Sequence, residues 1–194
     1  MGLAAKKASD RPLLKIKLAG KDDIERVTAI RSNAPNARLI VDANEGWTPE
    51  MVLPFSSKLA ELGVSMIEQP LPANNDAVLA EIPHPVPLCA DESAHTTADI
   101  EQLKGRYDIV NIKLDKTGGL TEALKFRDAI LSANMGVMVG CMLGTSLAMA
   151  PAMLIAQNAM FIDLDGPLLL AEDRKPGLCY TNAQIAPPST QLWG

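Results

Sequence analysis

Residues 39–68 read LIVDANEGWTPEMVLPFSSKLAELGVSMIE, and they show the alternation from which the fold can be predicted. It opens with an apolar, β-branched run that ends at Asp42 and closes with a second such run that ends at Glu68. Between the two runs, residues 48–50 (Thr-Pro-Glu) are a helix start, apolar residues recur at helical spacing, and Gly63 stops the helix. The stretch therefore predicts a strand, a helix and a second strand, which is one βαβ unit of a parallel sheet.

The same alternation continues along the whole chain. Apolar, β-branched runs lie at residues 13–18, 39–42, 66–68, 87–90, 109–114, 137–141 and 161–164. Their ends recur about every 22 to 28 residues, which favours a β/α barrel over an open doubly wound sheet, and no GxGxxG turn of a dinucleotide-binding sheet is present. A full barrel has eight strands in about 250 residues. We therefore predict an α/β fold: an incomplete TIM-like (β/α) barrel of seven strands in residues 1–166, followed by a helix-poor C-terminal tail, residues 167–194, that packs on the barrel.

Composition excludes several classes of protein. The net charge is −5 without a block of like charges, which argues against nucleic-acid binding. The three cysteines are scattered and form no CxxC pair, which indicates reduced thiols and a cytoplasmic protein. The N-terminus has no secretory signal. Residues 129–162 carry no charge, but their glycines, proline and polar residues predict a buried strand and a buried helix rather than a membrane span.

Three acids stand at the ends of three successive runs: Asp42, Glu68 and Asp91. Catalytic residues of such barrels gather at the C-terminal ends of the strands. Neighbouring strands lie about 4.8 Å apart, so these carboxylates can converge on one point. Converging carboxylates repel one another without a cation, and oxygen ligands without His or Cys suit Mg²⁺ before Ca²⁺ or Mn²⁺. The alternative is that each acid forms a salt bridge with a lysine on a flanking strand.

Lysines occupy the runs on either side of the acids. Lys15 and Lys17 flank Ile16 and so point to one side of the strand, and Lys113 lies in the run after Asp91. A lysine accepts a proton near neutral pH only when burial or nearby positive charge lowers its pKa. Two such bases with a metal between them suit removal of a proton next to a carboxylate and its return on the other face. The alternative is that these lysines reach solvent.

The Lys15-Ile16-Lys17 pair, the three acids, and Lys113 before Gly118-Gly119 resemble the enolase superfamily, muconate-lactonizing subgroup, from about residue 13 to the end. That superfamily uses a Lys base and Mg²⁺. The resemblance implies that Lys17 and Lys113 are the opposing acid/base residues and that Lys15 helps to hold the substrate carboxylate. It further implies that Asp42, Glu68 and Asp91 bind Mg²⁺.

Two further motifs resemble the L-Ala-D/L-Glu (dipeptide) epimerases within that subgroup. They are GCMLGTS at residues 140–146, which includes Cys141 and Met142, and DLDG at residues 163–166. The resemblance implies that Asp163 and Asp165 bind the free ammonium of a dipeptide, since a desolvated cation needs a carboxylate partner. Core packing of Cys141 and Met142, and capping or lysine pairing by the two aspartates, are the alternatives.

The resemblance implies Mg²⁺-dependent epimerisation of dipeptides by two-base 1,1-proton transfer through a metal-stabilised enolate. Alternatives are N-acylamino-acid racemisation, o-succinylbenzoate synthesis, cycloisomerisation, or a catalytically silent barrel that binds metal or a partner chain. Family members also carry an N-terminal capping domain and a first barrel strand, neither of which we find.

The resemblance implies a small-molecule substrate, and we expect no nucleic-acid or membrane partner. The chain is expected to form a homo-oligomer or to require a missing N-terminal portion.

Overall fold

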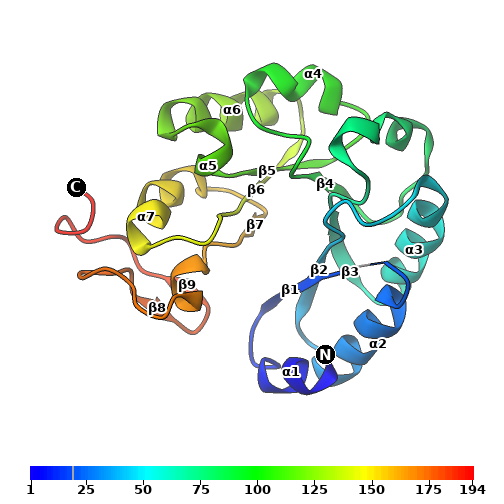
Figure 1. The fold of residues 1–194 in the computed structure, drawn as a ribbon, viewed down its shortest axis with the longest axis horizontal. Helices are drawn as coiled ribbons and strands as arrows, with labels where there is room; N and C mark the ends of the chain where they lie inside the picture. The colour runs from blue at the N-terminus through cyan, green and yellow to red at the C-terminus, as the bar shows by residue number, and fades with distance from the viewer. Residues whose placement is uncertain (19) are drawn as a thin grey trace. The chain divides into compact units, whose positions relative to one another are not determined.

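The structure, a computed structural model, describes residues 1–18 and 20–194. The chain folds as two compact units. One unit comprises Met1–Ser93 and Gly105–Asp108, and the other comprises Ala94–Lys104 and Ile109–Gly194. Each of the seven apolar runs forms a strand, and helices alternate with the strands (Figure 1). This succession confirms the predicted α/β class.

The first unit is a parallel sheet with helices packed along it. Its strands are neighbours in chain order: β1 (Leu13–Lys17), β2 (Arg38–Asp42), β3 (Val64–Glu68) and β4 (Leu88–Ala90). Its helices are α1 (Gly2–Lys7), α2 (Asp23–Asn33) and α3 (Pro49–Glu61), with 3-10 turns η1 (Ala73–Asn75) and η2 (Ala77–Glu81).

Helix α3 shows why the second βαβ connection forms where the sequence predicts it. Thr48 is extended and occupies the N-cap position of the helix, and Pro49 lies in the first turn. Proline has no backbone N–H, but at this position the N–H would have no partner within the helix, so no hydrogen bond is lost. Val52 and Leu59 are fully buried, so one face of α3 packs on the sheet. Gly63 has a φ of +69°, a left-handed conformation that glycine adopts without strain and that ends the helix.

The strand register of the first unit sets the level of the polar residues. Lys17 pairs with Asp42 across β1 and β2, and Asp42 pairs with Glu68 across β2 and β3. Paired residues on neighbouring strands point to the same face of a sheet. The three side chains therefore stand in one row at the C-terminal ends of their strands.

The second unit holds the remaining strands of the repeat. Strands β5 (Ile109–Ile112), β6 (Gly136–Val139) and β7 (Phe161–Ile162) are parallel neighbours. The other elements are η3 (Thr97–Asp99), α4 (Ile100–Leu103), α5 (Leu114–Thr117), α6 (Leu120–Ser132), α7 (Ser146–Ile155), η4 (Gly166–Leu169) and the hairpin β8 (Tyr180–Thr181) and β9 (Gln184–Ile185).

The strands of the second unit end earlier than the sequence predicts. Strand β6 ends at Val139, so Cys141 lies in the loop that follows it. Strand β5 ends at Ile112 rather than at Leu114, so Lys113 is the extended residue that precedes α5. Gly118, with a φ of +74°, closes the turn. Likewise β7 ends at Ile162, which leaves Asp163 and Asp165 in the loop that follows. Hydropathy alone extends a strand across such a turn because the turn also contains apolar residues.

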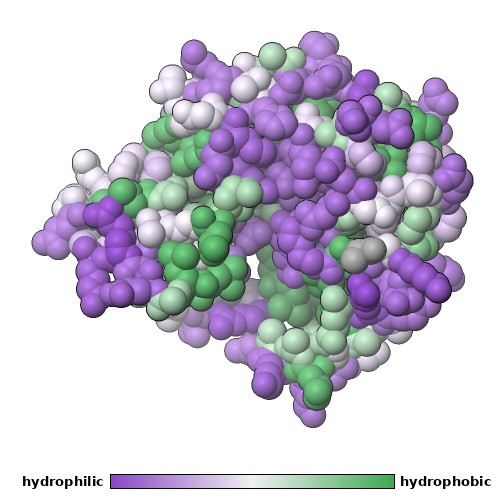
Figure 2. Space-filling model, viewed as in Figure 1, coloured by the Kyte–Doolittle hydropathy of each residue, from purple (hydrophilic) through white to green (hydrophobic). Residues whose placement is uncertain are grey.

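The uncharged stretch 129–162 forms strand β6 and helix α7, as predicted. Val137, Met138 and Val139 are at most 3% exposed, and Met149, Ala150 and Ala152 of α7 are similarly buried. Within the described residues, we find no helix whose length and apolar character would let it cross a membrane. Figure 2 shows a largely hydrophilic face with hydrophobic patches, and the exposed apolar side chains of this unit include Met142, Leu143, Leu168 and Leu169.

The C-terminal segment is short of helix and is bonded to the rest of its unit. The Tyr180 hydroxyl donates to the backbone oxygen of Leu164 at 2.7 Å. The Asp173 carboxylate accepts from the hydroxyl and the backbone N–H of Ser146, the first residue of α7. These contacts fix the segment against the start of α7 and the loop that carries Asp163 and Asp165.

Candidate active site

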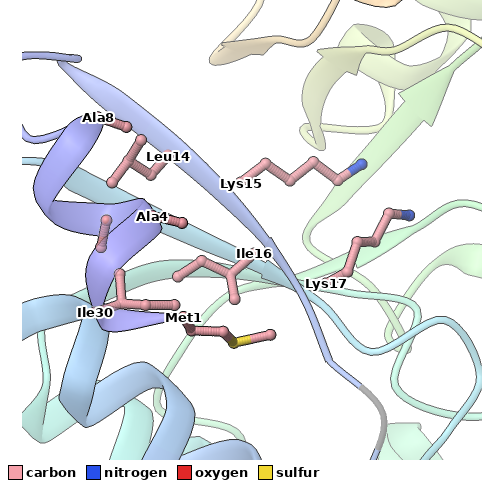
Figure 3. Close-up of a pocket in the computed structure, with 9 residues that line it drawn as sticks. Met1, Ala4, Ala8, Leu14, Lys15, Ile16, Lys17 and Ile30 are labelled. Atoms are coloured by element: carbon pink, nitrogen blue, oxygen red, sulfur yellow. The ribbon is translucent and has the colours of Figure 1, made fainter. Parts of the chain in front are cut away.

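Lys15 and Lys17 point to the same side of β1, as predicted. Figure 3 shows both side chains extending from one face of the strand, while Leu14 and Ile16 point toward α1 and Ile30. The alternation of a strand explains this arrangement, because successive side chains leave opposite faces. The two ammonium groups thus leave the apolar layer and lie on the face that carries Asp42 and Glu68.

Lys15 binds the acids at the ends of the next two strands, Asp42 of β2 and Glu68 of β3. Its Nζ lies 3.2 Å from Asp42 Oδ2 and 2.8 Å from Glu68 Oε2, and its side chain is only 17% exposed. Lys17 Nζ donates to Asp42 Oδ2 at 2.6 Å but is 62% exposed. Lys15 is therefore the buried counter-charge of the acids, and Lys17 reaches Asp42 from the solvent side.

The three acids sit deep in the first unit. Asp42 and Glu68 are fully buried and Asp91 is 3% exposed. Burial raises the pKa of Glu68 to about 7; Lys15 opposes this rise, and the charges of Asp42 and Asp91 add to it. The neighbouring Glu92 is half-buried and its pKa is also raised, by burial and by the charge of Asp91. The charges of Asp42 and Asp91 thus act on the Glu68 carboxyl.

The donor set fits a hard divalent cation. Across residues 1–18 and 20–194, no three Asp, Glu, His or Cys side chains stand already arranged around an ion position. The chemistry of the donors nevertheless matches, because Asp42, Glu68 and Asp91 supply only carboxylate oxygens from a buried place. Lys15 contacts Asp42 and Glu68, and Lys17 contacts Asp42. A divalent ion held by the three acids would add positive charge to this buried group.

In the second unit, Lys113 stands at the end of β5 beside a tightly packed asparagine. Asn111 is fully buried, and a Cβ added to Gly140 would lie 2.7 Å from its Oδ1 and 2.9 Å from its Nδ2. Glycine at position 140 therefore leaves the space that the Asn111 amide fills. The Asn111 side chain therefore requires glycine at position 140, the first residue of the GCMLGTS segment.

Cys141, Asp163 and Asp165 share one electrostatic environment. The pKa of the Cys141 thiol is raised to about 11, mainly by burial and also by the charges of Asp163 and Asp165, while a hydrogen bond with the Gly166 backbone and the charge of Lys113 oppose the rise. A Cβ added to Gly166 would lie 3.4 Å from Cys141 Sγ and 3.0 Å from the Met142 backbone oxygen, so the DLDG loop packs directly on the GCMLGTS loop. Met142 itself is 53% exposed. The structure thus groups the residues predicted to bind substrate.

The sequence model of the enolase C-terminal domain-like family matches residues 3–189 of the chain. The chain belongs to this family. The resemblance inferred from the KxK pair, the three acids and Lys113 is therefore confirmed at the level of the superfamily. The match also spans both compact units.

Two curated members of the family are each 50% identical to the chain. One is an N-acetyl-D-glutamate racemase from a Pseudoalteromonas species, aligned over 94% of this chain and 58% of the racemase. The other is the L-Ala-D/L-Glu epimerase of Escherichia coli K12, aligned over 89% of this chain and 54% of the epimerase. The chain therefore spans little more than half the length of the curated relatives it matches.

A solved member of the family from Agrobacterium tumefaciens superposes with a TM-score of 0.96 at 54% sequence identity. That protein has homology to dipeptide epimerases and was solved with sodium and L-Ala-L-Glu bound; the match covers all of this chain and 59% of that one. The superposition confirms the predicted fold class, an α/β chain that makes up part of a TIM-like barrel.

Sequence reasoning missed a set of buried polar residues behind the acids. Gln69 follows Glu68 directly, and its side chain contacts Ser93 and Tyr107, both of which also contact Asp76. Gln69 follows the last residue of β3 and is as polar as Glu68, so hydropathy does not predict that it is fully buried. Its partners lie 24 and 38 residues further along the chain, so no local pattern identifies them.

Proposed function

We propose that the chain carries the catalytic residues of a dipeptide epimerase of the L-Ala-D/L-Glu type, which inverts the α-carbon of the second residue. The observation that carries the proposal is the buried row of Lys15, Asp42 and Glu68 beside the more exposed Lys17. A buried, acid-rich site with an adjacent lysine suits the removal of a proton next to a carboxylate. The identity to the E. coli epimerase supports the same reaction.

In this proposal Lys17 and Lys113 are the two acid/base residues. One lysine takes the α-proton from one face of the substrate, and the other returns a proton to the opposite face. Each lysine must alternate between charged and neutral forms. The side chain of Lys17 is 62% exposed, and its Nζ lies 2.6 Å from Asp42 Oδ2. Lys15 would hold the substrate carboxylate with its ammonium.

Asp42, Glu68 and Asp91 would hold Mg²⁺. When bound, the ion supplies positive charge to the substrate carboxylate, which favours loss of the neighbouring proton. The three acids are almost inaccessible to solvent, so charges among them interact more strongly than they would in water. Lys15 would share the acids with the ion and keep their net charge small.

Asp163 and Asp165 would select the substrate. A dipeptide has a free ammonium, and two carboxylates on the loop after β7 can bind it. Both aspartates act on the pKa of Cys141, so they lie near the GCMLGTS loop that we propose lines the same pocket. The exposed Met142 would then contact the side chains of the dipeptide.

N-acylamino-acid racemisation is the second candidate, because the Pseudoalteromonas racemase is as similar to the chain as the epimerase is. An N-acetyl group carries no positive charge, so Asp163 and Asp165 would have no ammonium to bind. Neutralising both aspartates should therefore affect the two substrates differently. Asp163→Asn with Asp165→Asn should abolish turnover of a dipeptide but spare turnover of N-acetylglutamate.

The test is exchange of the α-proton in D₂O with Mg²⁺, followed by ¹H NMR. Two proteins are assayed: the chain alone, and the chain joined to the part of the E. coli epimerase that lies outside their alignment. Each is given L-Ala-L-Glu or N-acetyl-D-glutamate as substrate. Loss of the glutamyl α-proton of the dipeptide, stopped by a chelator and by Lys113→Ala, supports the epimerase. Exchange of N-acetylglutamate alone favours the racemase, and exchange of neither substrate in the joined protein contradicts both candidates.

A further inference from the structure

We infer that a buried hydrogen-bond network built from Gln69, Asp76, Ser93 and Tyr107 positions the acids Glu68 and Asp91 for the divalent cation. The inference rests on the metal site of the proposed function and adds four positioning residues to it. All four lie in the first unit and are buried, with Gln69 fully buried and Asp76 2% exposed.

Gln69 joins the ends of three strands. Its backbone N–H donates to the Cys89 oxygen at 2.8 Å, and its own backbone oxygen accepts from Glu45 at 2.8 Å. Its φ of +34° lies in the left-handed region that a residue with a Cβ rarely adopts, so the surroundings must hold it there. This backbone turn directs its side chain toward the loop that follows β4.

The Gln69 side chain binds the backbone of Asp91. Its Oε1 accepts from the N–H groups of Asp91 at 2.8 Å and of Ser93 at 3.2 Å. Glu68 and Asp91 are thereby linked through one intervening residue, since Gln69 is bonded to Glu68 in the chain and to Asp91 through its amide oxygen. The link fixes the separation of two backbones whose carboxylates repel each other.

Asp76 sets the direction of this amide. Ser93 Oγ lies 2.6 Å and the Tyr107 hydroxyl 2.8 Å from Asp76 Oδ2, and a carboxylate can only accept, so both hydroxyls donate to it. Each hydroxyl oxygen is then left as an acceptor, and both lie 2.8 Å from Gln69 Nε2. The amide nitrogen must face the hydroxyls, which turns Oε1 toward Asp91.

Two further observations support this direction of donation. Arg106 Nη1 lies 2.9 Å from Asp76 Oδ1, so the buried carboxylate has a cation beside it. Burial raises the pKa of Tyr107 far above its ordinary value, and its hydroxyl therefore keeps the proton that it donates. Gln69 Nε2 also reaches the Leu71 backbone oxygen at 2.9 Å, which completes the contacts of the amide.

A network that fixes ligands from behind usually contributes to metal affinity, and its loss typically weakens binding 10- to 100-fold. We expect Ser93→Ala and Asp76→Asn each to raise the Kd for Mn²⁺ by about 10-fold or more. Ser93→Ala removes one acceptor of the Gln69 amide. Asn at position 76 can donate as well as accept, so it no longer forces the hydroxyl hydrogens away from Gln69.

Ser56→Ala is the matched control. Ser56 is a fully buried serine of the same unit whose Oγ accepts from the Val86 N–H at 3.2 Å, and it shares no contact with the network. It should cost stability as Ser93→Ala does and leave the Kd for Mn²⁺ within about two-fold of that of the unsubstituted chain. Thermal unfolding of every variant shows that the comparison is made between folded proteins.

The experiment titrates the full chain and each variant with Mn²⁺, with free Mn²⁺ followed by electron paramagnetic resonance. Hydrogen exchange of the Asp91 amide, measured without metal, is the second readout, and it should quicken in Ser93→Ala and Asp76→Asn but not in Ser56→Ala. Unchanged Mn²⁺ affinity in both network variants overturns the inference and leaves the metal site standing. A similar loss in Ser56→Ala overturns it as well. An unsubstituted chain that binds no Mn²⁺ contradicts the proposed metal site and the inference together.

Discussion

The Nζ atom of Lys15 lies 2.8 Å from Glu68 Oε2, and this buried ion pair joins the first and third strands of the sheet across Asp42 on the strand between them. The pair explains how a row of acids can exist inside a folded chain without metal. Its loss removes a buried positive charge from beside two buried acids, and this gives the first prediction.

Lys15→Met should lower the free energy of unfolding of the metal-free chain by about 3 kcal/mol, because breaking a buried ion pair strands the opposite charge. Urea denaturation in the presence of a chelator measures the change. Lys58→Met is the control, since Lys58 forms an exposed pair with Glu61 whose loss should cost less than about 1 kcal/mol. Equal losses in the two variants would mean that Lys15 stabilises nothing beyond its own packing.

Mg²⁺ should stabilise the chain against unfolding. At a concentration about 100 times the Kd, binding to the folded state alone adds about 2.7 kcal/mol. Asp42→Asn should remove most of this gain because it takes away one charged ligand, whereas Asp128→Asn, which affects an exposed aspartate beside Arg127, should keep it. Thermal unfolding with Mg²⁺ and with a chelator measures the gain, and a full gain in Asp42→Asn would place the ion elsewhere.

Much of this site follows from the sequence, for identifiable reasons. Residues at the ends of neighbouring parallel strands lie at the same height in the sheet. Lys17, Asp42 and Glu68 could therefore be placed in one row from the repeat alone, and the strand register agrees. The sequence leaves salt bridges to flanking lysines as the alternative to metal binding, and Lys15 and Lys17 both make such contacts. It does not predict that Lys15 is the buried lysine and contacts two acids, because this depends on how the side chains pack. Gln69 could not be placed either, since its role depends on partners far along the chain and on a left-handed backbone conformation.

Cys141 should resist alkylation near neutral pH. Its pKa is raised to about 11, so the thiol is protonated below that pH and becomes a nucleophilic thiolate only as the pH approaches 11. Iodoacetamide with mass spectrometry should show Cys179, which is exposed, reacting first at pH 8, while Cys89, which is buried, stays unmodified.

Asp163→Asn tests the cause of that raised pKa. Removing a nearby negative charge should lower the pKa of Cys141, so the thiol should alkylate faster at a given alkaline pH. Asp173→Asn is a comparison within the same unit, because Asp173 bonds to Ser146 and does not act on Cys141. An unchanged alkylation rate of Cys141 in Asp163→Asn would mean that the charge of Asp163 does not act on the thiol in the GCMLGTS loop.

Gly140→Ala should destabilise the chain by about 1 to 3 kcal/mol, because the new methyl group would collide with the Asn111 amide. The double variant with Asn111→Ala removes the colliding atoms, so its loss should be smaller than the sum of the two single losses by about 1 kcal/mol or more. Urea denaturation of the four proteins completes the cycle. Strictly additive losses would show that contact with the Asn111 side chain is not the reason that position 140 requires glycine.

The most direct test of the two-lysine proposal is isotope exchange by single lysine variants of the joined protein described above. L-Ala-L-Glu and L-Ala-D-Glu are incubated separately in D₂O with Mg²⁺, and the glutamyl α-proton and the configuration of the product are followed by NMR. If Lys17 and Lys113 act on opposite faces, Lys17→Ala should exchange the proton of one epimer only, Lys113→Ala that of the other only, and neither variant should interconvert the two. Epimerisation by either variant at the rate of the unsubstituted protein would contradict the account.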